Sequence, residues 1–205
     1  MSTAAARITP SITTMIRMDH SHALALFHRF KADAPPGKKR ALVRNACLAL
    51  EIHAQLEEEI FYPALRAVMA GDEVLEKSRP EHDEMRRLIG ELRERVAGDA
   101  PVGDTSYDDL FLQLMRIVMH HVADEETRLL PAAERLLRDR LGELGLEMTK
   151  RRMELLKPHV GEIAASSIRS FPVGAAAGAV LVAGAVAVGT ALLWRKGNGY
   201  RRWRM

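Results

Sequence analysis

Residues 53–63, HAQLEEEIFYP, and residues 121–131, HVADEETRLLP, follow one pattern. Each begins with a histidine, continues after three residues with two glutamates, and ends after four more residues with a proline. In an α-helix, a side chain and the one four residues later lie on the same face. Each stretch therefore predicts a helix that presents a histidine and a glutamate together, and the repetition indicates a common purpose.

The rest of the chain favours helices as well. Apolar residues recur at steps of three and four, and no long stretch alternates as a half-buried strand would. Thr9 before Pro10 is a typical helix start, and Ser78-x-x-Glu81 has the spacing of a capping box. Four long helices with short, turn-rich connections predict an all-α fold, an antiparallel up-down four-helix bundle with an extra C-terminal helix. The predicted helices cover about residues 10–31, 38–69, 78–97 and 105–140, with Pro131 kinking the fourth, and a shorter helix continues through residue 157.

Each of the four long helices carries one histidine on its apolar stripe, and two of them also carry a glutamate there. A lone histidine beside a glutamate is usually a surface ion pair, but four histidines in register with apolar stripes predict burial. Burying imidazoles and carboxylates is costly unless something pairs them, and a metal ion pairs with both. Nitrogen and carboxylate ligands in a bundle core suit iron or manganese. Two ions, bridged by the glutamates and each held by two histidines, fit the predicted ligands His20, His53, Glu57, His82, His121 and Glu125.

The chain also repeats on a larger scale. Asp19-His20 precedes the first His-Glu stretch as Glu81-His82 precedes the second, with one helix and a turn between them in each case. Two αα hairpins, each giving two histidines and one glutamate, would build a pseudo-symmetric site for two ions.

Taken together, these residues resemble the hemerythrin-like (HHE cation-binding) domains, over residues 11–157. The resemblance rests on His20, His82 and the two His-x-x-x-Glu-Glu stretches with their prolines. It implies a four-helix bundle with a non-haem diiron centre bridged by oxygen and carboxylates. Family activities include binding or sensing of O2, sensing of iron, and handling of nitric oxide or peroxide. Oxygen-carrying members place a second histidine four residues after the first on the third helix, where this chain has Arg86, so the resemblance does not extend to reversible oxygen carriage.

Several residues near the predicted ligands stay open. Glu58 and Glu126 follow the bridging glutamates directly and are additional ligands, hydrogen-bond partners that orient the ligands, or solvated side chains. His120 could replace His121, although the stripe behind His120 is more polar and the repeated pattern selects His121. Tyr62 is expected to serve only packing.

The C-terminal part differs in composition. Residues 173–194 contain no charge and are long enough to cross a bilayer, and the basic tail 195–205 follows them. A buried soluble helix or an Ala/Gly-rich linker are the alternatives. Residues 158–172 are predicted to be a linker, and Gly174 with Gly178 has the spacing at which two membrane helices approach closely, which favours a homodimer. Since the N-terminus shows no secretory signal, a single C-terminal membrane anchor would leave the metal domain in the cytoplasm.

The charge distribution argues against one class of partner. The chain carries +3 in all, with a pI near 9.2, but from residue 171 onward it has five basic residues and no acidic one. The 25 basic and 27 acidic residues that remain make the predicted bundle slightly acidic, so nucleic acid is not expected as a partner.

Two functions follow from these expectations. The first is a membrane-tethered diiron module that senses or binds O2, nitric oxide, or the iron or redox state. The second is a diiron enzyme acting on peroxide or ferrous iron, for which Glu58 or Glu126 would be the proton donor. The predicted partners are therefore the lipid bilayer and small ligands such as O2, nitric oxide or peroxide.

Overall fold

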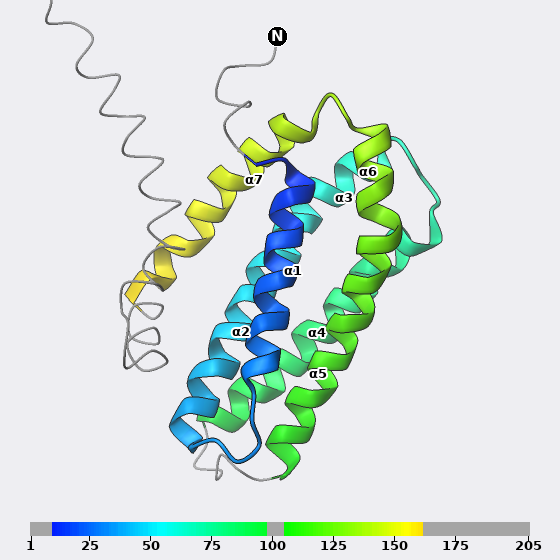
Figure 1. The fold of residues 1–205 in the computed structure, drawn as a ribbon. Coiled ribbons are helices and arrows are strands. Elements are labelled where there is room, and N and C mark those ends of the chain that lie inside the picture. The colour runs from blue at the N-terminus through cyan, green and yellow to red at the C-terminus, as the bar shows by residue number, and fades with distance from the viewer. Residues whose placement is uncertain (1–9, 98–104, 162–205) are drawn as a thin grey trace, which may run out of the picture. The chain divides into compact units, whose positions relative to one another are not determined.

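Helices account for nearly all of the residues that the computed structural model describes, which are 10–97 and 105–161. No strand occurs within these two ranges, so the all-α prediction is confirmed there. The elements are α1 (Ile12–Arg29), α2 (Pro36–Leu56), η2 (Glu57–Phe61), α3 (Tyr62–Arg66), α4 (Glu73–Ala97), α5 (Thr105–Asp124), η3 (Glu125–Leu129), α6 (Leu130–Leu136), α7 (Leu141–Leu156) and η4 (Lys157–His159). In Figure 1, α1, α2 with α3, α4, and α5 with α6 lie side by side.

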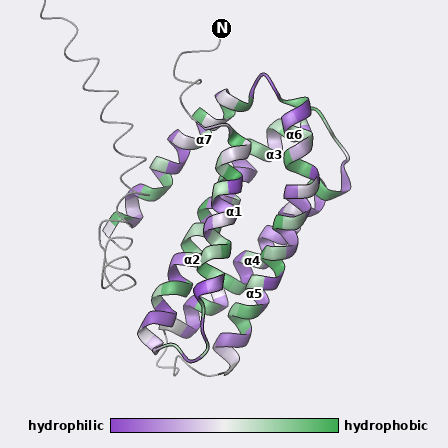
Figure 2. Cartoon of the chain, in the orientation of Figure 1, coloured by the Kyte–Doolittle hydropathy of each residue, from purple (hydrophilic) through white to green (hydrophobic). Residues whose placement is uncertain are grey.

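Apolar layers lie on both sides of a polar layer inside the bundle. Along α1, buried Ile12 and Ile16 precede His20, and buried Phe27 follows it. Phe27 meets Phe111 of α5 edge to face, with ring centroids 5.7 Å apart. Figure 2 shows apolar and polar residues interleaved along each helix, as expected of helices with one buried face. Because each buried side chain of this size stabilises the fold by roughly 1.5–3 kcal/mol, these layers hold the polar layer in place.

Both His-Glu stretches leave α-helical geometry at the same point. The π-helical turns η2 and η3 begin at Glu57 and Glu125. The N–H of the residue that follows each turn, Tyr62 or Leu130, donates to the glutamate carbonyl five residues earlier. Pro63 and Pro131 then stand in the first turns of α3 and α6. A proline has no N–H, and its ring clashes with the carbonyl four residues earlier, so a wider turn before it relieves the conflict. The kink predicted at Pro131 is therefore a π turn, and the second predicted helix is interrupted in the same way.

Two helix starts differ from their predictions. α1 begins two residues later than predicted, with Ser11 Oγ accepting from the N–H of Thr14 at 3.2 Å. Thr9, the predicted cap, lies outside the described residues. The capping box predicted at Ser78 is wrong, because Ser78 lies inside α4 and donates to a backbone carbonyl one turn earlier. Asp72 instead accepts two N–H groups of the first turn of α4, at 3.0 and 3.1 Å.

α7 packs against α1 and α2. Gly145 lies where α7 meets the start of α1, and a Cβ there would be 2.2 Å from the carbonyl oxygen of Pro10. Only glycine allows the two backbones to approach this closely. Two arginines farther along α7 form ion pairs with α1 and with η2. The helix is thus attached to the bundle at both of its ends.

The predicted membrane location is corrected by the structure. Within residues 10–97 and 105–161, no helix combines the length and the apolar composition needed to cross a bilayer. The predicted membrane helix at 173–194, with Gly174 and Gly178, and the basic tail lie outside the described residues. A membrane anchor is therefore not supported, and it plays no part in the function proposed below.

Candidate metal centre

The six predicted ligands lie together in the polar layer of the bundle. All six residues are buried, with exposed fractions between 0% and 6%. Together they bring four imidazoles and two carboxylates into one place between the apolar layers. These central residues are His20 of α1, His53 of α2, Glu57 of η2, His82 of α4, His121 of α5 and Glu125 of η3.

Each of the two central glutamates reaches both hairpins. Glu57 Oε2 lies 3.2 Å from Nε2 of His53, in the first hairpin, and 3.5 Å from Nε2 of His82, in the second. Glu125 Oε2 lies 3.1 and 3.7 Å from Nε2 of the two other central histidines. Both carboxylates therefore lie between one histidine of each hairpin.

Two groups of these side chains could each hold a metal ion, and Glu57 belongs to both. In each group, the facing nitrogen and oxygen atoms all lie within 4.8 Å of one another. The first group is His20, His53, Glu57 and Glu125, and the second is Glu57, His82 and His121.

The donor atoms fit a metal cation better than they fit hydrogen bonds alone. The Nε2 atoms of His82 and His121 face each other at 3.1 Å, and Glu57 Oε1 is buried without a hydrogen-bond partner in the described part of the chain. Two facing imidazole nitrogens can share only one proton, and an unpaired buried acceptor costs about 1–3 kcal/mol. A cation among these atoms would satisfy the lone pairs of all of them.

Each central histidine also has a carboxylate beside its outer ring nitrogen, Nδ1. A carboxylate in this place keeps the hydrogen on Nδ1 and leaves Nε2 facing the interior, which orients a histidine toward a metal. Three of the four contacts are hydrogen bonds, and the fourth, to His53, has an ion-pair distance. These outer carboxylates are Glu126 for His20 (2.8 Å), Glu58 for His82 (2.9 Å), Glu81 for His121 (2.7 Å) and Asp19 for His53 (3.5 Å).

The outer carboxylates connect the helices in a regular order. Asp19 and Glu81, which come directly before a central histidine, each face the histidine of the next long helix. Glu58 and Glu126, which come directly after a central glutamate, each face a histidine of the other hairpin. The repeated order of the sequence is therefore a repeated order of contacts, and Glu58 and Glu126 stand among the orienting residues.

Each outer carboxylate also forms an ion pair with the cationic side chain of an arginine or a lysine. One of the four cations is Arg86, four residues after His82 on α4. Three of the four come from α1 and α4, and one comes from α7. The pairs are Arg17 with Glu126 (3.1 Å), Arg86 with Glu58 (2.8 Å), Lys77 with Glu81 (3.8 Å) and Arg152 with Asp19 (2.5 Å).

Comparison with known proteins agrees with this geometry. Residues 11–133 match the hemerythrin HHE cation-binding domain. The chain belongs to this family. The predicted resemblance is confirmed, and with it a cation-binding helical domain.

One curated protein is similar to this HHE chain, a DNA nickase of a Nostoc species (strain PCC 7120). It is 32% identical over 122 residues, which are 60% of this chain and 33% of that protein. The chain thus spans about a third of the length of this relative. No solved structure matches the chain significantly.

Tyr62 belongs to the HHE site, although the sequence predicted only packing for it. Its side chain is 2% exposed, and its O–H lies 3.1 Å from Glu57 Oε2 and 2.9 Å from Glu125 Oε1. In an α-helix, a residue five positions after Glu57 would point away from it, but the wider π turn of η2 brings the two to the same side. The proline that follows Tyr62 was the one sequence signal for this turn.

His120 lies outside the polar layer. Its side chain is 71% exposed and lies 3.9 Å from Asp124, whereas His121 is buried in the layer. Glu81, His120 and Asp124 could together hold a cation at the surface. Lys77 already pairs with both of the carboxylates, so this group has the counterion that it needs.

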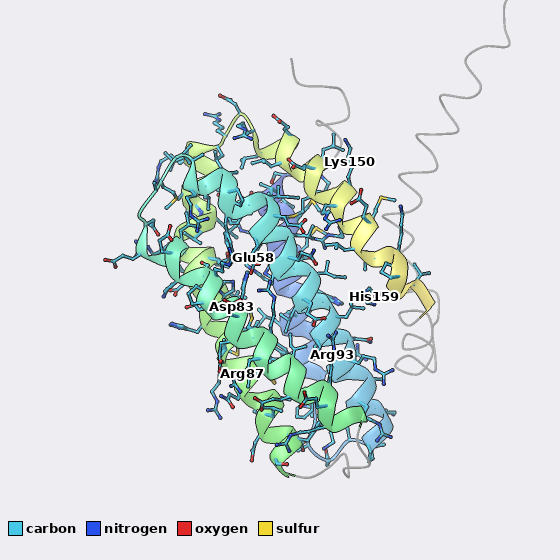
Figure 3. The ribbon with its side chains drawn as sticks, turned by 180° about the vertical axis from the view of Figure 1, so that it is seen from behind. Glu58, Asp83, Arg87, Arg93, Lys150 and His159 are labelled. Carbon is cyan, nitrogen blue, oxygen red and sulfur yellow. The ribbon has the colours of Figure 1, made fainter. Side chains whose placement is uncertain are left out.

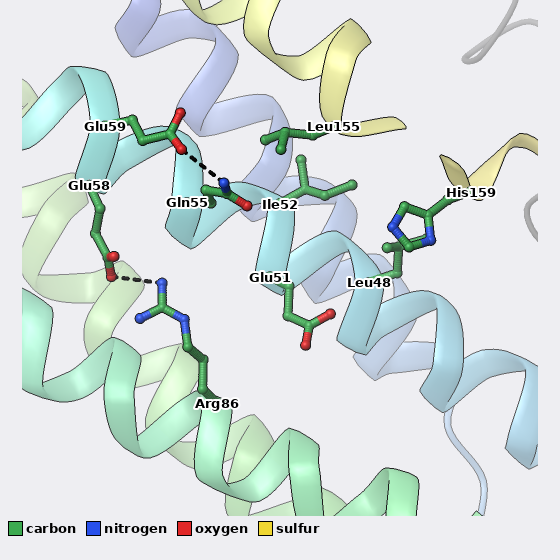
Figure 4. A pocket seen from close by; sticks show the side chains of 9 residues that line it. All are labelled: Leu48, Glu51, Ile52, Gln55, Glu58, Glu59, Arg86, Leu155 and His159. Carbon is green, nitrogen blue, oxygen red and sulfur yellow. Dashed lines mark hydrogen bonds and ion pairs between the residues drawn. The ribbon is translucent and has the colours of Figure 1, made fainter. Parts of the chain in front are cut away.

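The Glu58–Arg86 pair lies in the wall of a surface pocket of about 460 Å³ (Figure 4). α2 and η2 form one side of this pocket, α4 contributes Arg86, and the end of α7 with η4 contributes Leu155 and His159. Figure 3 shows this side of the domain, with Glu58 and His159 labelled. The outer partner of buried His82 is therefore partly exposed to solvent.

Charges within the polar layer shift several pKa values. Burial lowers the pKa of His121, but the facing carboxylates outweigh burial and raise that pKa to about 10. The same opposition raises the pKa of His20 and of His82. Burial raises the pKa of Glu57, but the facing imidazoles lower it well below its usual value. Without a metal, the facing carboxylates therefore favour protonation of these imidazoles, and a metal would compete with those protons.

Proposed function

We propose that this hemerythrin HHE domain binds two iron ions through the six central residues and senses or binds O2 or nitric oxide, or the iron or redox state. The supporting observation is that Glu57 belongs to both groups of donors, with each central glutamate between histidines of both hairpins. A shared carboxylate favours two neighbouring ions over one. Manganese has similar ligand preferences and is the alternative ion.

Iron bound here would supply reversible electron transfer and affinity for diatomic ligands. The residues of the chain provide binding and orientation. The outer carboxylates hold the histidine rings, and the apolar layers on both sides limit access of water. A buried site of this kind favours small uncharged ligands such as O2 and nitric oxide over charged ones.

Arg86 favours sensing over carriage. Glu58 Oε1 accepts from both His82 Nδ1 at 2.9 Å and Arg86 Nη2 at 2.8 Å. A change of charge at the centre would alter the hydrogen bond of His82 to Glu58, and through it the ion pair in the wall of the surface pocket. The pair thus supplies a route by which the state of the centre reaches the protein surface.

Anaerobic titration of the full chain with Fe2+ tests this function. We expect saturation at two ions per chain, followed by a change in the visible spectrum on exposure to O2 or nitric oxide that reduction reverses. The supporting reason is the shared carboxylate between two histidine pairs. Saturation at a single ion, or a loaded protein that responds to neither gas, would show that the proposal is wrong.

A second candidate function is an enzyme that reduces peroxide or oxidises ferrous iron, and Tyr62 favours it. Such chemistry needs a proton donor beside the reacting atoms. The sequence suggested Glu58 or Glu126, but these lie behind the histidine rings. The phenol of Tyr62 lies beside both central glutamates and is the better donor.

Tyr62→Phe separates the two functions. It should leave the iron content unchanged and, if the protein turns over peroxide, slow turnover about 100-fold, as expected for loss of a general acid. Tyr107→Phe is the matched control, because Tyr107 is equally buried but its O–H has no hydrogen-bond partner among the residues that the structure describes. Peroxide consumption at the same rate in both variants would remove Tyr62 from any catalytic role.

The Nostoc relative is named for DNA nicking, but two thirds of that protein lie outside the similarity. The residues of this chain before 171 are slightly acidic in sum, which disfavours a DNA surface. Our proposal therefore concerns metal binding and leaves DNA cleavage out.

A further inference from the structure

We propose that α7 is part of the metal centre, in which Arg152 holds Asp19 in position behind His53 and so sets the affinity of the His20–His53 half for its ion. This inference rests on the proposed two-ion site. α7 lies beyond residues 11–133, which match the family, so this role belongs to a helix outside the matched region.

The two hairpins differ in the helix that supplies the cation for one outer carboxylate. Asp19 and Glu81 occupy equivalent places, since each precedes a central histidine and faces the histidine of the next long helix. Glu81 has its cation on its own helix, because Lys77 lies one turn earlier at 3.8 Å. The residue one turn before Asp19 is Met15, which is buried and uncharged. α1 therefore lacks the equivalent cation, and Arg152 of α7 stands in its place.

The Arg152–Asp19 pair is the most buried of the four outer pairs. Its side chains are 24% and 18% exposed, whereas the other three cations are 35% to 42% exposed. Two N–H groups of Arg152 donate to the two oxygens of Asp19 at 2.5 and 2.6 Å, and such bidentate pairs fix orientation as well as position.

The same pair reaches a central histidine. Asp19 Oδ2, which accepts from Arg152 Nη2, is also the oxygen that faces His53 Nδ1 at 3.5 Å. Within the described residues, His53 Nδ1 has no hydrogen-bond partner, so Asp19 is the group positioned to orient this ring. A displacement of Arg152 would therefore displace the carboxylate behind His53.

Arg151, the neighbour of Arg152 on α7, is a matched control. It makes a comparable bidentate pair with Glu59, at 2.6 and 3.0 Å. Glu59 is 37% exposed, and its hydrogen-bond partners among the described residues are Arg151 and Gln55. Loss of Arg151 therefore removes a similar attachment of α7 without changing the surroundings of a central histidine.

Equilibrium binding of Co2+ to the full chain tests the inference. Arg152→Gln should lower the affinity for one of the two ions by roughly 10-fold, the lower end of the range for residues that orient metal ligands. The affinity for the other ion should stay unchanged. Arg151→Gln should bind both ions as the wild type does. Asp19→Asn should lower the affinity for the same ion, and the double variant Arg152→Gln with Asp19→Asn should lower it no further. Arg152→Lys should restore part of the affinity that Arg152→Gln loses.

The outcomes separate this inference from the proposed function. Wild type that binds fewer than two Co2+ ions would overturn the two-ion site and the inference together. Two ions in wild type, with affinities in Arg152→Gln that match or exceed those in Arg151→Gln, would overturn the inference alone. If Arg152→Gln lowers the melting temperature more than Arg151→Gln does, Asp19→Asn and Arg152→Lys decide by the same affinity criterion.

Discussion

Glu57→Gln is expected to abolish binding of both metal ions while the helical bundle is kept. Glu57 is common to both groups of donors, so the substitution removes a ligand from each. Glutamine keeps the shape of the side chain, but it carries no charge, and its NH2 group offers no lone pair to a cation. The affinity for both ions should fall by more than the roughly 10–100-fold that is typical of residues which only orient ligands. Elemental analysis after metal loading, with circular dichroism to check the fold, measures this.

The run Glu57-Glu58-Glu59 supplies its own graded controls. Glu57 is fully buried, Glu58 is 20% exposed and accepts from His82 Nδ1, and Glu59 is 37% exposed and pairs with Arg151. Glu58→Gln should lower the affinity for one ion by about 10-fold, and Glu59→Gln should leave the affinity for both ions unchanged. If all three variants lose metal equally, or if Glu57→Gln still holds two ions, the shared position of Glu57 is not what holds the centre together.

The central residues could be predicted because a spacing of four matches one helical turn. His53 with Glu57, and His121 with Glu125, stood on apolar stripes in the sequence, and the structure buries all four residues to 6% exposure or less. Burial of charged groups then demanded a cation, whatever the details of the loops. The outcome depended only on local periodicity, which a sequence displays directly.

The roles of Tyr62 and of Arg152 could not be predicted in this way. A regular helix places Tyr62 on a different face from Glu57, and only the π turn before Pro63 brings them together. The role of Arg152 could not be predicted for another reason. Arg152 pairs with Asp19 across 133 positions of the chain, and no local pattern records a contact between α1 and α7.

Metal-free protein is expected to lose stability as the pH rises from 6.5 toward 10. His121 has an ordinary pKa of 6.5 and a folded-state pKa of about 10, because facing carboxylates outweigh the effect of burial. A raised folded-state pKa gives stability that is fully present below 6.5 and is lost as the pH passes through the folded value. If the free energy of unfolding falls by an amount on the order of a few kcal/mol over this range, the melting temperature should fall by about 10 °C.

The carboxylates are expected to limit the stability of the metal-free protein at acidic pH. The pKa values of Glu57, Glu58 and Glu81 lie below the ordinary value of 4.5, so their contribution is present above 4.5 and is lost as the pH falls further. Metal competes with the imidazole protons, so added Co2+ should raise the melting temperature more at about pH 8 than at about pH 6. His121→Gln should flatten the alkaline slope, whereas His120→Gln, at a site that is 71% exposed, should keep it. A metal-free protein whose melting temperature stays level or rises between about pH 6.5 and 9.5 would show that the imidazolium–carboxylate pairs do not hold the metal-free site.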